Sequence, residues 1–266
     1  GTGMLDKIAS GGASLEDNNT GSQQAASAVV KRYIAPDGDG VTFWGYSLVG
    51  SPLDGASIGD FANATDFYYS GVEGSDYPTS SSTVLFWDEK GGAIVSPGTA
   101  NTPMDTLGGG AWAMSYGSQN PTLHSAGKLR SHVDGASVST DLTRTPGSNF
   151  EGWNLICNPF QAYLDWDAVI DHGTNSSLIE DQYAIYDTQS KQFVRYSKTN
   201  GLLTSAPKYI QPGQGYWVRM NHATDTTGTL SIPASAIAVN ADNVDFVRSD
   251  DEGVFDATLL LEIEGN

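Results

Sequence analysis

Residues 45–53 read GYSLVGSPL, and residues 152–160 read GWNLICNPF. The two stretches match position by position, with residue 45 aligned to residue 152. Each is a short apolar segment that ends in a proline-containing turn, a pattern typical of a β-strand followed by a turn. Because a stretch of this kind occurs twice, it indicates two copies of one β-rich module.

Three further landmarks recur in the same order along the chain. Residues 85–88 (LFWD) parallel 184–187 (AIYD), 108–113 (GGGAWA) parallel 213–218 (GQGYWV), and 127–129 (GKL) parallel 228–230 (GTL). Chance similarity would not preserve this order, and loops of unequal length explain the small changes in spacing. The sequence therefore predicts tandem copies related by internal duplication.

Composition favours β structure throughout. The chain has 266 residues, is 39% hydrophobic, and contains 31 Gly and 11 Pro, so it combines packed cores with many turns. We predict an all-β fold of two tandem antiparallel β-sandwich modules with jelly-roll character; one jelly roll spanning both copies is the alternative. The expected parts are an N-terminal segment (1–30), repeat 1 (31–148), repeat 2 (149–240), and an acidic connector with a terminal strand (241–266).

Charge and cysteine content limit the partners. The chain has 13 Lys and Arg against 31 Asp and Glu, a net charge of -18 that repels nucleic acid and anionic lipid headgroups. No apolar run approaches the roughly 20 residues of a membrane span. The single cysteine, Cys157, lies in an apolar run, so we interpret it as a core residue. Neither nucleic acid nor membrane insertion is expected.

A wider set of segments resembles a known family. The resemblance covers about residues 14–237 and rests on residues 14–18, 29–34, 44–52, 152–155, 158–160, 165–166 and 210–218. Together they are similar to the conserved β-rich region of cell-surface and secreted, adhesin-like proteins that Bacteroidetes export by type IX secretion. Departures are Cys157, where Gly is common, Phe160, where Tyr is common, and the missing sorting domain, so we expect a piece of a longer protein.

This resemblance implies an extracellular, cell-surface location and no particular activity. We expect a non-enzymatic structural and adhesion module without a cofactor, whose partners are other surface-protein modules or copies of itself, in a larger surface structure or filament. The alternative is a carbohydrate-binding accessory module of a secreted polysaccharide-degrading enzyme, with polysaccharide as the partner.

Candidate catalytic groups are few. Asp165 and Asp167 flank Trp166, and on a strand they would share a face as the two carboxylates of a glycosidase do. They also match the Asp-Trp turn of the resembled family, and we prefer this structural interpretation. The four histidines are scattered, without the close spacing of a zinc site. The sequence therefore predicts no catalytic residues, although a hydrolase would lose turnover on Asp165→Asn.

Two weaker binding sites are predicted in loops. Asp37 and Asp39, separated by glycine, have the oxygen-rich character of a calcium loop, but the later ligands of an EF-hand are missing, so a plain turn is the simpler interpretation. Tyr68, Tyr69 and Tyr77 lie in a less repeated loop region and could stack on sugar rings. Calcium and polysaccharide are thus the ligands to test.

Modification and assembly provide two last hypotheses. Thr106 and Thr226 each follow Asp, as in the O-glycan acceptor sites of the resembled bacterial group. The apolar run Leu259, Leu260, Leu261 and Ile263 resembles the first strand of another module. An apolar strand at the end of a chain can pair with a neighbouring sheet, so this run is the predicted assembly strand.

Overall fold

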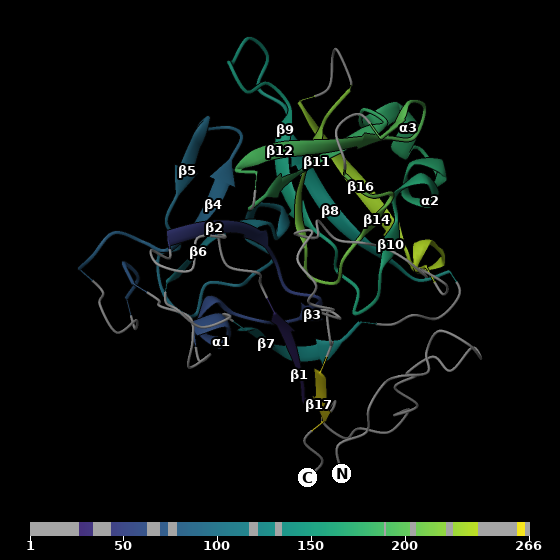
Figure 1. The fold of residues 1–266 in the computed structure, drawn as a ribbon. Coiled ribbons are helices and arrows are strands. Elements are labelled where there is room, and N and C mark those ends of the chain that lie inside the picture. The colour runs from purple at the N-terminus through teal and green to yellow at the C-terminus, as the bar shows by residue number, and fades with distance from the viewer. Residues whose placement is uncertain are drawn as a thin grey trace.

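The computed structural model describes residues 27–33, 44–62, 70–73, 79–116, 122–130, 135–188, 190–202, 206–221, 226–238 and 260–263. Strands that pair antiparallel make up most of the regular secondary structure in these ranges (Figure 1). The helical elements in the described ranges are short: α1 (Ile58–Ala62), α2 (Trp166–Asp171), α3 (Asn175–Leu178) and the 3₁₀ turns η1 (Thr106–Gly108) and η2 (Ala234–Ala236). The prediction of an all-β fold is confirmed.

Two larger sheets hold the landmark segments of the sequence. One has the strand order β2-β6-β4-β5, and the other has the order β13-β12-β11-β15-β9. Their strands are β2 (Trp44–Val49), β4 (Val84–Asp88), β5 (Ala93–Val95), β6 (Ala111–Tyr116), β9 (Trp153–Cys157), β11 (Gln182–Asp187), β12 (Gln192–Ser197), β13 (Gly201–Leu202) and β15 (Gly215–Arg219).

The remaining strands form three smaller groups. A sheet with the order β17-β1-β7-β3 lies at the bottom of Figure 1, and β16 pairs with β8 and β10 with β14 elsewhere. These strands are β1 (Ser27–Tyr33), β3 (Leu53–Asp54), β7 (Thr122–Leu129), β8 (Ser137–Thr143), β10 (Leu164–Asp165), β14 (Tyr209–Ile210), β16 (Thr227–Pro233) and β17 (Leu260–Ile263).

The two halves share one strand order. Strands β2, β6, β4 and β5 are neighbours in the first sheet as β9, β15, β11 and β12 are in the second, and β1 pairs with β7 as β8 pairs with β16. The pairing of β8 with β16 places residues 137–143 in the second half, ahead of the boundary expected at residue 149. The internal duplication itself stays a prediction, with this shared order in its favour.

Strand alternation gives each half its own core. In β4, Val84 and Phe86 point into the first core, whereas Trp87 points the other way, as the two-residue period of a strand requires. The first core also contains Val49, Ala56, Ile58, Val72, Met104, Ala111 and Ala113. The second is larger and packs the five-stranded sheet against the β8–β16 pair and α2; its largest buried side chains are Trp166, Tyr183, Tyr216, Phe160 and Leu142.

Between the two halves lies a further apolar layer, separate from the two cores, which we call the seam. Its buried residues are Leu48, Trp87 and Leu155, and Trp112, Tyr186 and Trp217 pack against them. These side chains come from the faces of the two larger sheets that point away from the two cores. The seam therefore joins the two halves through hydrophobic contact as well as through the chain.

Contacts across the seam come in matching pairs. An antiparallel bridge joins Val49 to Gln214, and the aligned positions Ile156 and Gly109 form the same bridge. The ring centroids of Trp112 and Tyr186 lie 5.2 Å apart, and those of the aligned Trp217 and Trp87 lie 5.5 Å apart.

These two matched pairs of contacts are what an approximate two-fold relation between the halves would produce. Such a relation is the arrangement of an isologous dimer interface within one chain.

Candidate functional site

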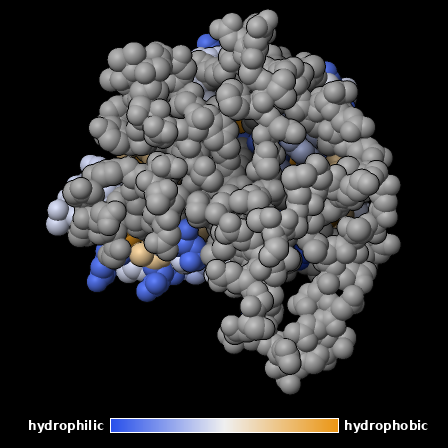
Figure 2. Space-filling model, turned by 60° about the horizontal axis from the view of Figure 1, so that its bottom comes forward, coloured by the Kyte–Doolittle hydropathy of each residue, from blue (hydrophilic) through white to orange (hydrophobic). Residues whose placement is uncertain are grey.

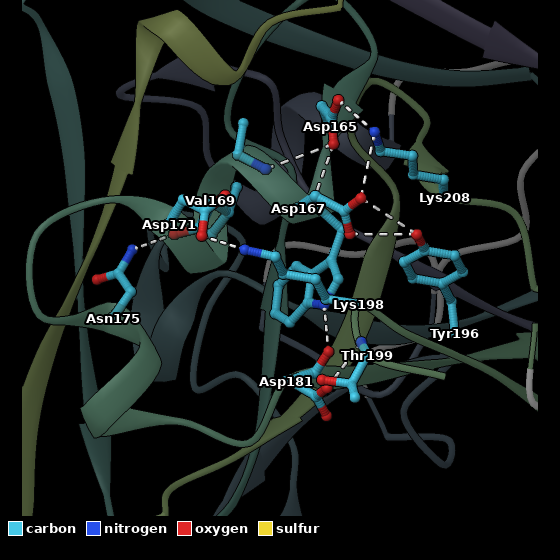
Figure 3. Close-up of polar contacts among 12 residues, drawn as sticks. Asp165, Asp167, Val169, Asp171, Asn175, Asp181, Tyr196, Lys198, Thr199 and Lys208 are labelled. Carbon is cyan, nitrogen blue, oxygen red and sulfur yellow. Dashed lines mark hydrogen bonds and ion pairs between the residues drawn. The ribbon is translucent and has the colours of Figure 1, made fainter. Parts of the chain in front are cut away.

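Asp165 and Asp167 lie where β10 ends and α2 begins (Figure 3). The Asp165 backbone is extended, and its Oδ1 accepts hydrogen bonds from the backbone N–H of Asp167 at 2.9 Å and of Ala168 at 3.4 Å. An aspartate in this position satisfies N–H groups that the first helical turn leaves unpaired. The segment is therefore a capped helix start and not a strand with two carboxylates on one face.

A single ammonium group bridges the two carboxylates. Lys208 Nζ lies 3.0 Å from Asp165 Oδ2 and 3.2 Å from Asp167 Oδ2. Burial alone would lower the pKa of Lys208, but the hydrogen bonds and negative charges of the two aspartates outweigh it and raise this pKa above its usual value. Lys208 therefore stays charged at neutral pH and fixes the distance between the helix start and the segment before β14.

Tyr196 completes the cluster from β12. Its hydroxyl donates to Asp167 Oδ1 at 3.1 Å, and Figure 3 shows the ring on the far side of Asp167 from Asp165. Burial, together with the negative charge of Asp167, raises the pKa of Tyr196 to about 12. The phenol is thus a proton donor to Asp167 over the whole physiological range and no ready base.

The cluster of Asp165, Asp167, Tyr196 and Lys208 uses its polar atoms internally. Both oxygens of each carboxylate accept hydrogen bonds or an ion pair from this chain. A glycosidase needs one carboxyl group that can give a proton to the leaving oxygen and a second that faces water or the sugar. The observed hydrogen bond and ion pairs instead hold α2, β12 and the residue before β14 together, which stabilises the fold.

Trp166 anchors this helix start in the second core. The side chain is fully buried, its Nε1 donates to the Asp181 carbonyl at 2.9 Å, and its ring meets Tyr183 and Tyr216 edge to face at 5.2 and 5.9 Å. A buried indole of this kind combines a large apolar contact with a satisfied N–H. In the Asp-Trp motif, Asp165 therefore caps the helix and Trp166 packs in the second core.

Asp181 holds the neighbouring turn between β12 and β13. Its Oδ2 accepts from Ser197 Oγ at 3.0 Å and from the Thr199 backbone N–H at 2.9 Å. Burial opposes the charge, but these hydrogen bonds prevail and lower the pKa of Asp181. Lys198 in the same turn pairs with Asp171 at the end of α2. The aspartates drawn in Figure 3 thus stabilise turns and helix ends of the fold.

The other predicted site residues that the structure describes lie in separate elements and form no common site. Thr106 lies in η1, where its Oγ1 donates to the Pro103 carbonyl at 2.7 Å, and Thr226 is exposed just before β16. Leu260, Leu261 and Ile263 form β17. The sites proposed at Asp37 and Asp39, at Tyr68, Tyr69 and Tyr77, and at Leu259 lie outside the described residues.

Some of the exposed large hydrophobic side chains pack against the seam. Among the described residues the exposed ones are Tyr46, Ile94, Leu107, Phe150 and Phe193, and rings of three of them contact seam tryptophans. Trp87 is buried, whereas Trp112, Trp153 and Trp217 are half-buried. On the face shown in Figure 2, the described surface at the lower left is mainly hydrophilic around a small hydrophobic group. Trp87, Trp112 and Trp217 therefore serve as packing residues between the halves.

Cys157 and the acidic residues offer no metal centre in the described part of the chain. No three His, Cys, Asp or Glu side chains meet there in a way that could hold a metal ion. Cys157 is buried, and burial raises the pKa of its thiol to about 12. The thiol therefore stays protonated and packs as an apolar side chain.

No local sequence pattern predicts the partners of Asp165 and Asp167. Tyr196 and Lys208 are distant in sequence and have no motif around them; only the strand pairing of β11 with β12 and of β10 with β14 brings them to the helix start. The Asp-Trp-Asp spacing was the available signal, and it identified the carboxylates alone.

The described residues thus define an all-β protein with two similarly wound halves and a tightly packed seam. Comparisons with protein-family models, with curated proteins and with solved structures found no match. Within the described ranges, every helix is too short and polar to cross a lipid bilayer. The resemblance to type IX-secreted surface proteins stays a prediction.

Proposed function

We propose that the chain is a non-enzymatic structural and adhesion module of an extracellular surface protein. The observation that carries the proposal is the seam, which ties the two halves together by matching backbone bridges and ring contacts. A module that holds a binding surface away from a cell has to transmit force without hinging. Two halves that share an apolar layer and backbone bridges meet this requirement better than two domains joined only by a flexible linker.

Buried polar contacts across the halves support the same proposal. Glu89, which follows β4, accepts hydrogen bonds from the backbone N–H groups of Thr145 at 2.7 Å and Gly152 at 2.9 Å. Trp87 Nε1 donates to the Trp153 carbonyl at 2.7 Å, and Gln214 Nε2 donates to the Leu48 carbonyl at 2.9 Å. Directional bonds to buried backbone groups fix the relative orientation of the halves, because breaking any of them leaves an unpaired group.

The non-enzymatic part of the proposal is supported by the Asp165–Asp167 cluster. These two carboxylates are the closest approach to a catalytic pair that the sequence offered, and they act as a helix cap and as ligands of Lys208. The extracellular part rests on the resemblance to secreted surface proteins and on an acidic chain with net charge -18.

Assembly with further copies would require a change in pairing. Strand β17 pairs antiparallel with β1 of the same chain, from Ala28 opposite Ile263 to Lys31 opposite Leu260. The same register could form between β17 of one copy and β1 of the next, because strand exchange keeps every backbone hydrogen bond. We therefore propose self-assembly as a concentration-dependent exchange, measured by light scattering with and without residues 255–266 and with and without a calcium chelator.

The enzymatic alternative is tested by incubating the chain with plant, algal and bacterial polysaccharides and measuring the release of reducing ends. The proposal expects none from the native chain. Asp165→Asn and Asp171→Asn are matched variants on the same helix, and only the first touches the carboxylate pair. Turnover that Asp165→Asn abolishes and Asp171→Asn preserves would contradict the proposal and make the chain a hydrolase.

A further inference from the structure

A cleft of about 380 Å³ opens between the two halves. Its walls come from the β2–β3 turn and the η1 loop of the first half and from β8 and the end of β9 in the second. The volume falls within the range of about 300–1,000 Å³ seen for small-molecule sites, and interfaces between domains are a usual place for them. The cleft is therefore large enough for one sugar-sized ligand.

Arg130 lines this cleft with unused hydrogen-bonding capacity. Its Nη1 lies 3.4 Å from Asp54 Oδ1 and its Nη2 lies 3.4 Å from the Leu53 carbonyl, and its buried Nε has no hydrogen-bond partner among the described residues. A guanidinium group carries five N–H donors, and both contacts are at the long limit of hydrogen bonding. Arg130 can therefore bind an acceptor that enters the cleft.

Two carboxylates line the same cleft. Asp105 lies at the η1 side and Asp141 on β8, where Asp141 Oδ1 accepts from Thr229 Oγ1 at 2.8 Å. Carboxylates accept hydrogen bonds, whereas the Arg130 guanidinium donates them. A ligand that satisfies both has to present groups that donate and accept over a short distance, as the hydroxyl groups of a sugar do.

Charge argues against a charged ligand. An anion attracted by Arg130 would also meet Asp54, Asp105 and Asp141, on a chain of net charge -18. A cation attracted by the aspartates would meet the guanidinium. The neutral parts of the lining, such as Leu107, Val138 and Pro159, can contact the C–H groups of a ring.

We propose that this cleft binds one sugar residue of an uncharged glycan. The inference rests on the adhesion function proposed above and supplies it with a ligand class and a place. Arg130 donates to ring or hydroxyl oxygens, Asp105 and Asp141 accept from hydroxyl groups, and the apolar side chains cover a ring face. Since the walls come from both halves, binding also requires that the seam stay closed.

The test is an array of neutral oligosaccharides of glucose, galactose, mannose and N-acetylglucosamine beside oligomers of glucuronate and galacturonate, followed by calorimetric titration of the neutral glycan that binds best. The full chain is compared with Arg130→Gln, which removes the cation, with Ser139→Phe, which places a ring in the cleft from β8, and with Lys198→Met, which removes a cation paired with Asp171 and no part of the cleft. Thermal unfolding of each variant verifies its fold.

We expect binding to neutral glycans that Arg130→Gln and Ser139→Phe each weaken about tenfold or more, and that Lys198→Met leaves unchanged. No binding to any neutral glycan, binding to uronates alone, or binding that survives both cleft variants would each overturn the inference. These outcomes leave the proposed function standing. Hydrolysis of the bound glycan would instead contradict the non-enzymatic function, whatever the cleft variants do.

Discussion

Adding one methyl group at Gly215 would test the seam with the smallest possible change. A Cβ atom built at Gly215 lies 2.7 Å from the Val49 nitrogen and 2.8 Å from the Leu48 carbonyl carbon. Both neighbours are backbone atoms of β2, so they cannot move aside without separating the strand from β15. Overpacking of this kind costs about 1–3 kcal/mol. We expect Gly215→Ala to lower the free energy of unfolding by an amount in that range.

The chain offers a symmetric repeat of this experiment and a control. At the aligned Gly110, a Cβ would lie 2.7 Å from the Ile156 carbonyl oxygen and from Leu155 Cγ, so Gly110→Ala should cost a similar amount. At Gly98 a Cβ meets nothing within 4 Å, so Gly98→Ala should be neutral or slightly stabilising. The measurement is urea unfolding followed by tryptophan fluorescence. If Gly215→Ala and Gly110→Ala were as stable as Gly98→Ala, the close approach of the halves would be refuted.

Three further predictions concern single side chains. Asp165→Ala should cost about 0.5–2 kcal/mol of stability in urea unfolding through loss of the helix cap, and an equally stable variant would rule the cap out. Because the pKa of Tyr196 is raised to about 12, its stabilising effect should be complete below about pH 10 and should disappear as the pH rises toward 12. Tyr196→Phe should flatten that loss in alkaline unfolding curves, whereas an unchanged slope would contradict the assignment. Cys157, with its thiol pKa raised to about 12, should react with an aromatic disulfide reagent at pH 8 only after unfolding, and rapid reaction of the folded chain would show that it is accessible.

Local patterns were sufficient to predict the strands. The segments around residues 45–53 and 152–160 became β2 and β9, and the GGGAWA and GQGYWV segments became β6 and β15, because period-two apolar sequence bounded by glycine and proline has few other stable conformations. Within each larger sheet, the third landmark strand lies between the first and the second, an order that the sequence did not predict. Interactions within a few residues determine the strands, but not the order in which they pair.

Contacts between distant residues could not be predicted in the same way. No pattern near Arg130 indicates that it lines one cleft with Asp105 and Asp141, and none near Lys208 indicates that it bridges Asp165 and Asp167. The pairing of β8 with β16 joins strands on opposite sides of the boundary expected at residue 149, and local patterns do not predict it, since strand pairing depends on which edge the chain reaches after its loops. Such features depend on the tertiary arrangement and become visible only in the folded chain.

Calorimetric unfolding of the full chain tests most directly the claim that the two halves act as one structural unit. We expect a single transition whose calorimetric and van't Hoff enthalpies agree, because the seam couples the two cores, and Gly215→Ala should lower its midpoint or split it. Two separate transitions in the native chain, with midpoints that Gly215→Ala leaves unchanged, would contradict the claim.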